Sequence, residues 1–342
     1  MKRIVTAAVV GLGLAFAAGD ALADGELHIF NWGDYTNPDV IKKFEQAYNV
    51  KVTLDSYDSN DQMIAKIKAG GSGYDIVVPS SYVIPSMVKD GLLAPTEPDQ
   101  MENFKNMRPE FVHVYWDDGR HYTVPWQWGT TGISVNTDLY KGPADSWALL
   151  FNPPDELKGK INVVPEMGDV MNAVSFYLGL PVCSDKKEDL QKINDTLIAA
   201  KPFWRTMDYG TLEKLTGKDV AVSMNWNGYS MRARMQVPAV KYVYPKEGIA
   251  SWMDNVAVVK DAPNMENAKK FENFIMDPQN AAGLSAFARY DNGIANSQQY
   301  MPDDMKGAPE IAPPAGFKPY FVPACSQEVA EIYSKIWNNL LK

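Results

Sequence analysis

One continuous apolar run, "YDIVVPS" (residues 74–80), constrains the fold more than any other stretch of this chain. A strand that is apolar on both faces needs cover on both, as in a parallel sheet flanked by helices. Helix signals precede it: a proline at the first turn opens a helix at residues 38–44, and a capping-box pattern opens another at 59–69. Strand patterns at residues 27–31 and 51–57 alternate with these helices, which predicts a doubly wound α/β lobe.

The remainder of the chain predicts a second α/β unit. Its expected elements are strands at residues 133–136, 161–164, 221–225 and 240–244 and helices at 170–180 and 329–341. A strand at residues 255–259 suits a return to the first unit, and such chain crossings form a hinge. Because 342 residues are too many for one compact core, we predict two lobes. Lobe 1 comprises residues 24–132 and 254–298, and lobe 2 comprises 133–253 and 299–342.

The first 23 residues predict a secretory signal peptide. They begin with two basic residues, continue with an apolar run too short to span a bilayer, and end in a small-residue pattern that places cleavage near Ala23. The sequence therefore predicts that the exported chain is periplasmic. Its net charge of −9 disfavours nucleic acid and anionic membranes as partners and favours small cations.

Export also bears on the only two cysteines, Cys183 and Cys325. A disulfide survives in an oxidising compartment, so the two can pair. The alternative of two free thiols stays open, because the sequence does not give the Cα separation that the bond requires.

Signatures of catalysis and cofactor binding are missing from the sequence. The three histidines lack the HExxH spacing, and two cysteines cannot form a zinc knuckle. GxSxG, GxGxxG and P-loop patterns do not occur. We therefore predict no metal and no cofactor, and an enzyme is disfavoured.

Polar and aromatic residues follow two of the predicted strands. Trp32, Asp34 and Tyr35 come directly after the first strand, and Ser80 and Tyr82 come after the apolar run. Ligands of doubly wound sheets bind at the carboxyl ends of strands. We therefore expect these side chains to meet in one cleft.

Further acidic and aromatic residues occupy similar positions. Glu166 and Asp169 flank a strand-to-helix turn, Trp226 ends a strand, and Trp252 is followed closely by Asp254. Carboxylates accept charge-assisted hydrogen bonds from ammonium groups, and aromatic faces pack on methylenes and attract cations. This combination predicts recognition of an alkylammonium ligand. Alternatively, the first two acids only cap a helix, the indoles are packed rings, and Asp254 is a solvated turn acid.

Six stretches resemble a known family when taken in order. They are "FNWGDY", "YDIVVPSSY", "WGTTGISVN", "MNWNGYS", "YPKEGIASWMD" and "FARYDNGIAN". Together they cover nearly the whole chain beyond the leader and resemble the periplasmic polyamine-binding proteins of ABC transporters, the spermidine/putrescine receptors. The resemblance implies a two-lobed type II periplasmic-binding-protein fold with a hinged interlobe cleft. It also implies a monomeric receptor that captures putrescine or spermidine and delivers it to a membrane permease.

The resemblance assigns roles to the first group of candidates. The "WGDY" stretch, with Trp32, Asp34 and Tyr35, holds one end of the amine. Ser80 and Tyr82 line the same wall.

It assigns the remaining roles to later parts of the chain. Trp226 and Trp252 sandwich the methylenes, and Asp254 takes an inner ammonium. Glu166 and Asp169 stand where the family often has acids. A polar contact comes from the "FARYDNGIAN" stretch, through Tyr290.

One departure leaves the ligand length open: the residue after "WNG" is Tyr229, where some putrescine-preferring relatives carry an acid.

Two other functions also stay open. The same aromatic box suits a quaternary ammonium compound or an amino-acid derivative. Paired carboxylates such as Glu166 and Asp254 are also a feature of exported hydrolases.

Overall fold

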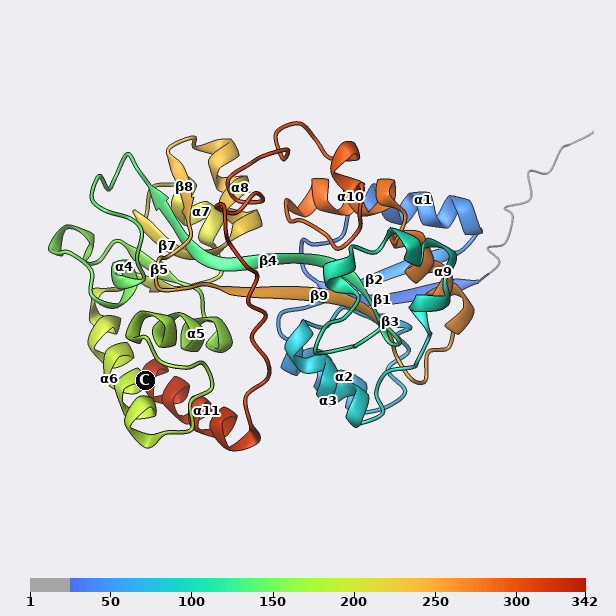
Figure 1. Ribbon diagram of the computed structural model, residues 1–342, viewed down its shortest axis with the longest axis horizontal. Helices are drawn as coiled ribbons and strands as arrows, with labels where there is room; N and C mark the ends of the chain where they lie inside the picture. The colour runs from blue at the N-terminus through green and yellow to red at the C-terminus, as the bar shows by residue number, and fades with distance from the viewer. Residues whose placement is uncertain (1–24) are drawn as a thin grey trace, which may run out of the picture.

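The computed structural model describes residues 25–342, so the predicted signal peptide lies outside the described residues. Within them, the strands form one sheet in the order β2-β1-β3-β9-β4-β7-β5-β6, with β8 beside β4. Helices pack around this sheet in two lobes (Figure 1). The sequence suggested two separate α/β units, whereas the structure joins them through a shared sheet.

Lobe 1 contains the first elements of the chain and two later helices. Its elements are β1 (Glu26–Trp32), α1 (Pro38–Tyr48), β2 (Lys51–Tyr57), α2 (Asn60–Lys68), β3 (Ile76–Val77), the 3-10 turn η1 (Ser81–Val83), α3 (Ile84–Lys89), α9 (Met265–Ile275) and α10 (Pro278–Ala288). β1 pairs in parallel with β2 and β3, as predicted. The apolar run contributes two residues to β3, and beyond them Ser80 forms an isolated bridge to Asp254 of β9.

Both predicted helix starts in lobe 1 are capped by side chains. Asn37 accepts a hydrogen bond from the Asp39 amide, and Ser59 accepts one from the Gln62 amide at 3.2 Å. In the expected capping box, Gln62 would accept from the Ser59 amide; it accepts from the Asp58 amide instead, at 2.9 Å. The local sequence signals therefore predicted both helix starts correctly, although the second hydrogen bond of the capping box has a different donor.

Two long strands connect the lobes. They are β4 (Thr123–Asn136) and β9 (Ala250–Val258), which run antiparallel side by side from lobe 1 to lobe 2 (Figure 1). Every residue of β4 is buried. The predicted lobe boundaries at residues 132/133 and 253/254 fall inside these two strands.

Lobe 2 surrounds the far ends of the long strands. Its elements are α4 (Ala148–Phe151), β5 (Ile161–Val163), α5 (Met167–Leu178), α6 (Lys187–Ala200), β6 (Thr206–Met207), α7 (Thr211–Thr216), β7 (Val222–Trp226), α8 (Asn227–Gln236), β8 (Val240–Val243) and α11 (Gln327–Leu341). β8 pairs with β4, and α11 packs on α5 and α6.

The buried apolar side chains form two main clusters. One draws on residues 27–128 and 253–294, and the other on residues 133–224 and 329–340. Each lobe therefore has its own core, and each core combines segments that are distant in the sequence.

The segment before α11 crosses the long strands on its way back to lobe 2 (Figure 1). It contacts β9, where the Ser251 amide donates to the Tyr320 carbonyl at 2.9 Å. At its end, Cys325 forms a disulfide with Cys183, with a Cα–Cα distance of 5.1 Å. The pairing that the sequence left open is thus confirmed. Between residues 25 and 342, no helix has the length and apolar character needed to cross a membrane.

The disulfide joins residues 142 positions apart, so it restricts the unfolded chain strongly. We expect reduction to lower the free energy of unfolding by about 2–5 kcal/mol. Thermal and urea unfolding with and without dithiothreitol measure this change. The double variant Cys183→Ser/Cys325→Ser is the control and should not respond to reductant. Equal stability of the oxidised and reduced protein would contradict the prediction.

Candidate functional site

Asp254 lies at the centre of the candidate site, on β9 between the two lobes. Only 7% of the residue is exposed. Its carboxylate accepts hydrogen bonds from the Ser80 hydroxyl at 2.6 Å and from the Tyr35 hydroxyl at 3.1 Å. The structure therefore brings the segments after β1 and β3 together at one acidic group, and the solvated-acid alternative for Asp254 is wrong.

The environment of Asp254 disfavours its charged form. Burial raises the pKa of its carboxyl to about 7, although the hydrogen bonds from Ser80 and Tyr35 lower it in part. Repulsion from the Asp169 carboxylate raises the pKa further. Asp169 belongs to lobe 2, so the two acids act on each other electrostatically across the junction of the lobes.

Asp169 sits in the first turn of α5 but does not cap it. Its oxygens accept hydrogen bonds from the Trp226 indole at 2.9 Å and from the Thr131 hydroxyl at 3.0 Å. Burial raises the pKa of this carboxyl to about 6, and the two hydrogen bonds lower it in part. The capping alternative is therefore wrong for Asp169.

Glu166 occupies the N-cap position of α5, yet its side chain makes no capping hydrogen bond. It accepts instead from the Tyr209 hydroxyl at 3.2 Å. Burial raises the pKa of Glu166 to about 7, and repulsion from Asp169 adds to this. On the lobe 1 side, partial burial and the charge of Glu166 raise the pKa of Tyr82.

Two partly buried indoles stand beside the acids. Trp226 stacks on Tyr209 with ring centroids 6.3 Å apart and an interplanar angle of 13°. Trp252 meets Tyr290 edge to face at 5.1 Å. Among the described residues, the Trp252 indole N–H is a buried donor without a partner. The packed-ring alternative accounts for the ring contacts but not for this donor.

Glycines allow two of these rings to lie close to the backbone. A Cβ at Gly129 of β4 would lie 2.7 Å from the Trp252 ring. A Cβ at Gly228 of α8 would lie 2.5 Å from the Tyr290 ring. Both glycines are therefore required for the present positions of the rings.

The side chains of the "WGDY" stretch point to different partners. The Trp32 indole donates to the Val78 carbonyl at 3.0 Å, and Tyr35 reaches Asp254 as described. Asp34, with a left-handed φ of 53°, forms an ion pair with Arg232 of α8 at 2.7 Å. Arg232 is not among the residues that the sequence predicted for the site. The only feature of the sequence that could have indicated Arg232 is its position one helical turn after Tyr229, on the helix that follows Trp226.

The last two candidates lie on lobe 1. Tyr82 is 40% exposed, and its hydroxyl accepts a hydrogen bond from the Asn60 amide nitrogen at 3.1 Å. Tyr290 is buried, and its ring meets Tyr35 edge to face at 5.8 Å. Burial raises the pKa of Tyr290 well above its usual value, so this phenol is neutral.

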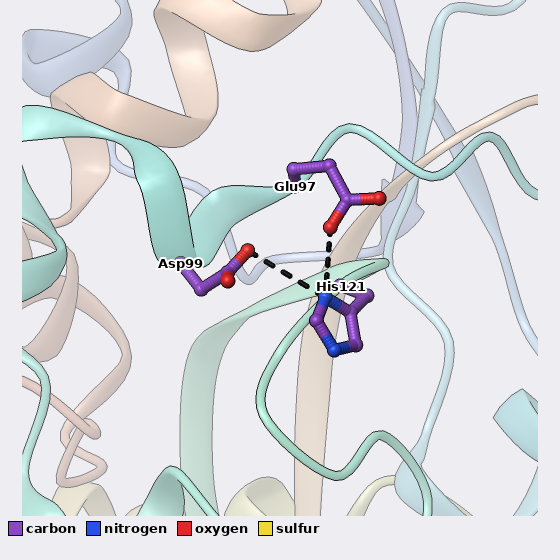
Figure 2. Close-up of side chains that lie close together, drawn as sticks. All are labelled: Glu97, Asp99 and His121. Atoms are coloured by element: carbon purple, nitrogen blue, oxygen red, sulfur yellow. Dashed lines mark hydrogen bonds and ion pairs between the residues drawn. The ribbon is translucent and has the colours of Figure 1, made fainter.

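A separate polar cluster lies on the lobe 1 surface (Figure 2). His121 Nδ1 contacts a Glu97 carboxylate oxygen at 2.7 Å and an Asp99 oxygen at 3.6 Å. The hydrogen bond to Glu97 raises the pKa of His121. Of the described residues, these are the ones that gather three metal-ligand groups, but the two ion pairs account for the arrangement. The absence of a metal stays a prediction.

A cavity of about 580 Å³ lies elsewhere, between residues 108–116 and the segment before α11. Its walls include Phe111, Trp116, Trp128 and Phe321. None of the candidate ligand residues lines it. This cavity is therefore separate from the acidic and aromatic candidates.

Comparisons with known proteins agree with the fold. A family model described as bacterial extracellular solute-binding protein matches residues 39–313. The putrescine-binding periplasmic protein SpuD of Pseudomonas aeruginosa is 32% identical over 321 residues, covering 88% of this chain and 86% of that protein. The spermidine/putrescine-binding periplasmic protein of Escherichia coli is 29% identical over 293 residues, covering 84% of this chain and 83% of that protein.

A solved structure gives the same result. The spermidine/putrescine ABC transporter substrate-binding protein PotD from Streptococcus pneumoniae has a TM-score of 0.81 and 26% identity, covering 93% of this chain and 98% of that chain. The predicted two-lobed α/β fold and the family resemblance are thereby confirmed.

The raised pKa values predict how stability depends on pH. A carboxyl whose pKa is higher in the folded than in the unfolded chain binds more protons when folded. Its stabilising contribution is present at low pH and is lost as pH rises from about 4 to about 7. As pH rises from 5 to 8, we therefore expect the unfolding free energy of Asp254→Asn to increase by about 1–3 kcal/mol relative to that of the wild type.

Urea unfolding across this pH range measures the difference. Asp261→Asn, an exposed acid beyond the end of the same strand, is the matched control and should show no such trend. A difference between Asp254→Asn and the wild type that is constant with pH would count against the prediction.

Proposed function

The chain belongs to the family of bacterial extracellular solute-binding proteins, and we propose that it captures a putrescine- or spermidine-like amine between its two lobes. Three of the names that its relatives carry specify putrescine or spermidine. Most of the candidate acidic and aromatic side chains converge where the lobes meet.

The observation that carries the proposal is a group of acids without protein cations, of which Asp254 is buried and Asp169 and Glu166 are partly buried. No Lys, Arg or His between residues 25 and 342 forms an ion pair with Asp254, Asp169 or Glu166. Buried carboxylates without a counter-charge are unfavourable, and their raised pKa values express this. A ligand with several ammonium groups supplies the missing positive charges and donates charge-assisted hydrogen bonds.

The surrounding groups suit the rest of such a ligand. Trp226, Trp252 and Trp32 offer apolar faces to methylene groups and attract cations through their rings. Hydroxyls of Tyr35 and Ser80 fix the Asp254 oxygens, so the remaining acceptor directions are oriented for a bound ammonium. Motion of one lobe against the other about β4 and β9 would exclude water from these groups and strengthen their attraction for the ligand.

The biological role follows from the ligand and the family. We propose that the chain is exported by its first 23 residues, works in the periplasm as a monomer, and delivers the amine to the permease of an ABC transporter. It binds its ligand without chemical change and needs neither cofactor nor nucleic acid. A quaternary ammonium ligand would leave the carboxylates without hydrogen-bond donors. Hydrolysis would need Glu166 and Asp254 to work as an acid–base pair. Both alternatives are tested together with amine binding.

Calorimetric titration of ligand-stripped protein tests the proposal. Putrescine or spermidine should bind with a dissociation constant of about 1 μM or tighter, whereas betaine and γ-aminobutyrate should bind at least about a hundredfold more weakly. Absence of heat with either amine, or turnover of a glycoside that is lost in Glu166→Gln, would overturn it.

Asp254→Asn should weaken amine binding at least about tenfold, because the inner ammonium loses its charged acceptor. Asp261→Asn is the matched control and should bind as the wild type does. Unchanged affinity of Asp254→Asn would remove this residue from the site.

The amine affinity should also fall as pH is lowered. The ligand ammonium groups stay protonated throughout, as a lysine does, whereas the acids of the site take up protons below about pH 7. We expect binding at pH 5.5 to be at least about tenfold weaker than at pH 8 and to release protons. Calorimetry in buffers of different ionisation enthalpy measures both quantities. Equal affinity at the two pH values, with no proton release, would contradict the prediction.

A further inference from the structure

The ion pair between Asp34 and Arg232 links the two lobes beside the candidate site. Asp34 follows β1 in lobe 1, and Arg232 lies on α8, which packs against α7 and β8 in lobe 2. The guanidinium contacts the carboxylate at 2.7 Å and lies 5.0 Å from the centre of the Tyr229 ring. Asp34 is thus an acid of the predicted ligand set that already has a cation.

The arrangement around Arg232 has the same chemistry as an amine-binding subsite. A carboxylate accepts the hydrogen bond, and an aromatic face lies against the cation. Asp34 is followed in the chain by Tyr35, whose hydroxyl donates to Asp254 at 3.1 Å, so the pair lies beside the group that holds the inner acid. A side chain of the protein therefore fills a position that a ligand ammonium would otherwise fill.

We propose that Arg232 acts as an internal cation that limits the ligand to a short diamine. This inference rests on the proposed function. With Asp34 occupied, the members of the predicted ligand set that lack a cation are Asp254 on one side and Asp169 and Glu166 on the other. Asp254 lies on β9, and Thr131 of the paired strand β4 donates to Asp169, so the two sides lie along the same pair of strands. A diamine places one ammonium at each side, whereas the third ammonium of spermidine finds Asp34 already paired.

The Asp34–Arg232 pair contributes little to the stability of the fold, so variants that remove it should still fold. About half of the Asp34 side chain and a quarter of the Arg232 side chain are exposed. Ion pairs this exposed stabilise proteins only slightly. We therefore expect Arg232→Gln to fold with an unfolding temperature close to that of the wild type.

The experiment compares the affinities for putrescine and spermidine in four proteins by calorimetry. They are the wild type, Arg232→Gln, Asp34→Asn and the double variant. The wild type should prefer putrescine. In Arg232→Gln the freed Asp34 can accept the third ammonium, so the spermidine-to-putrescine affinity ratio should rise at least about tenfold. In the double variant the ratio should return to near the wild-type value, because no carboxylate is left at this position.

Arg205→Gln is the matched control. It removes another exposed arginine that pairs with an aspartate, Asp219, at 3.9 Å, and the affinity ratio should not change. A wild-type preference for spermidine, a ratio unchanged in Arg232→Gln, or an equal rise in the double variant would overturn the inference while leaving amine binding intact. A wild type that binds neither amine would overturn the proposed function itself.

Discussion

The structure depends on negative charge that is buried without a cation from the protein. Asp254 is buried and Asp169 and Glu166 are partly buried, and the hydrogen-bond donors to all three are neutral hydroxyl and indole groups. Neutral donors orient the carboxylates but compensate only part of the lost hydration. The fold therefore holds these carboxyl groups in an environment that disfavours their charged form, and under the proposed function a positively charged ligand would relieve this cost.

The long strands bring these acids together. Asp254 belongs to β9, which crosses between the lobes, and Thr131 of the neighbouring β4 donates to Asp169 of lobe 2. Gly129 of β4 leaves room for the Trp252 ring beside the same crossing. The elements that connect the lobes thus also carry and position groups of the site. A movement at the crossing changes the site directly, without a chain of intermediate contacts.

The sequence predicted most elements of the fold because their signals are local. Caps at Asn37 and Ser59 and the strand at residues 51–57 depend on neighbouring residues and appear as expected. The continuity of the sheet was missed, because β4 contains Gly, Thr and Gln where a buried strand was expected to show an apolar run. The Asp34–Arg232 pair was missed for a different reason: its members are far apart in the sequence, and neither has a local feature that indicates the other. Whether Asp169 caps its helix or faces the site depends on side-chain direction, which spacing alone does not give.

The composition of the two cores has a consequence for biogenesis. The first core needs residues up to 294, and the second is completed only by the helix that ends at Leu341. Neither lobe can fold while the ribosome is still making the middle of the chain, since long-range contacts must wait for their partners. The nascent polypeptide thus stays without a finished core until residue 294 has been made, and without the second core until its last helix emerges, a property compatible with threading an extended chain through a translocation channel.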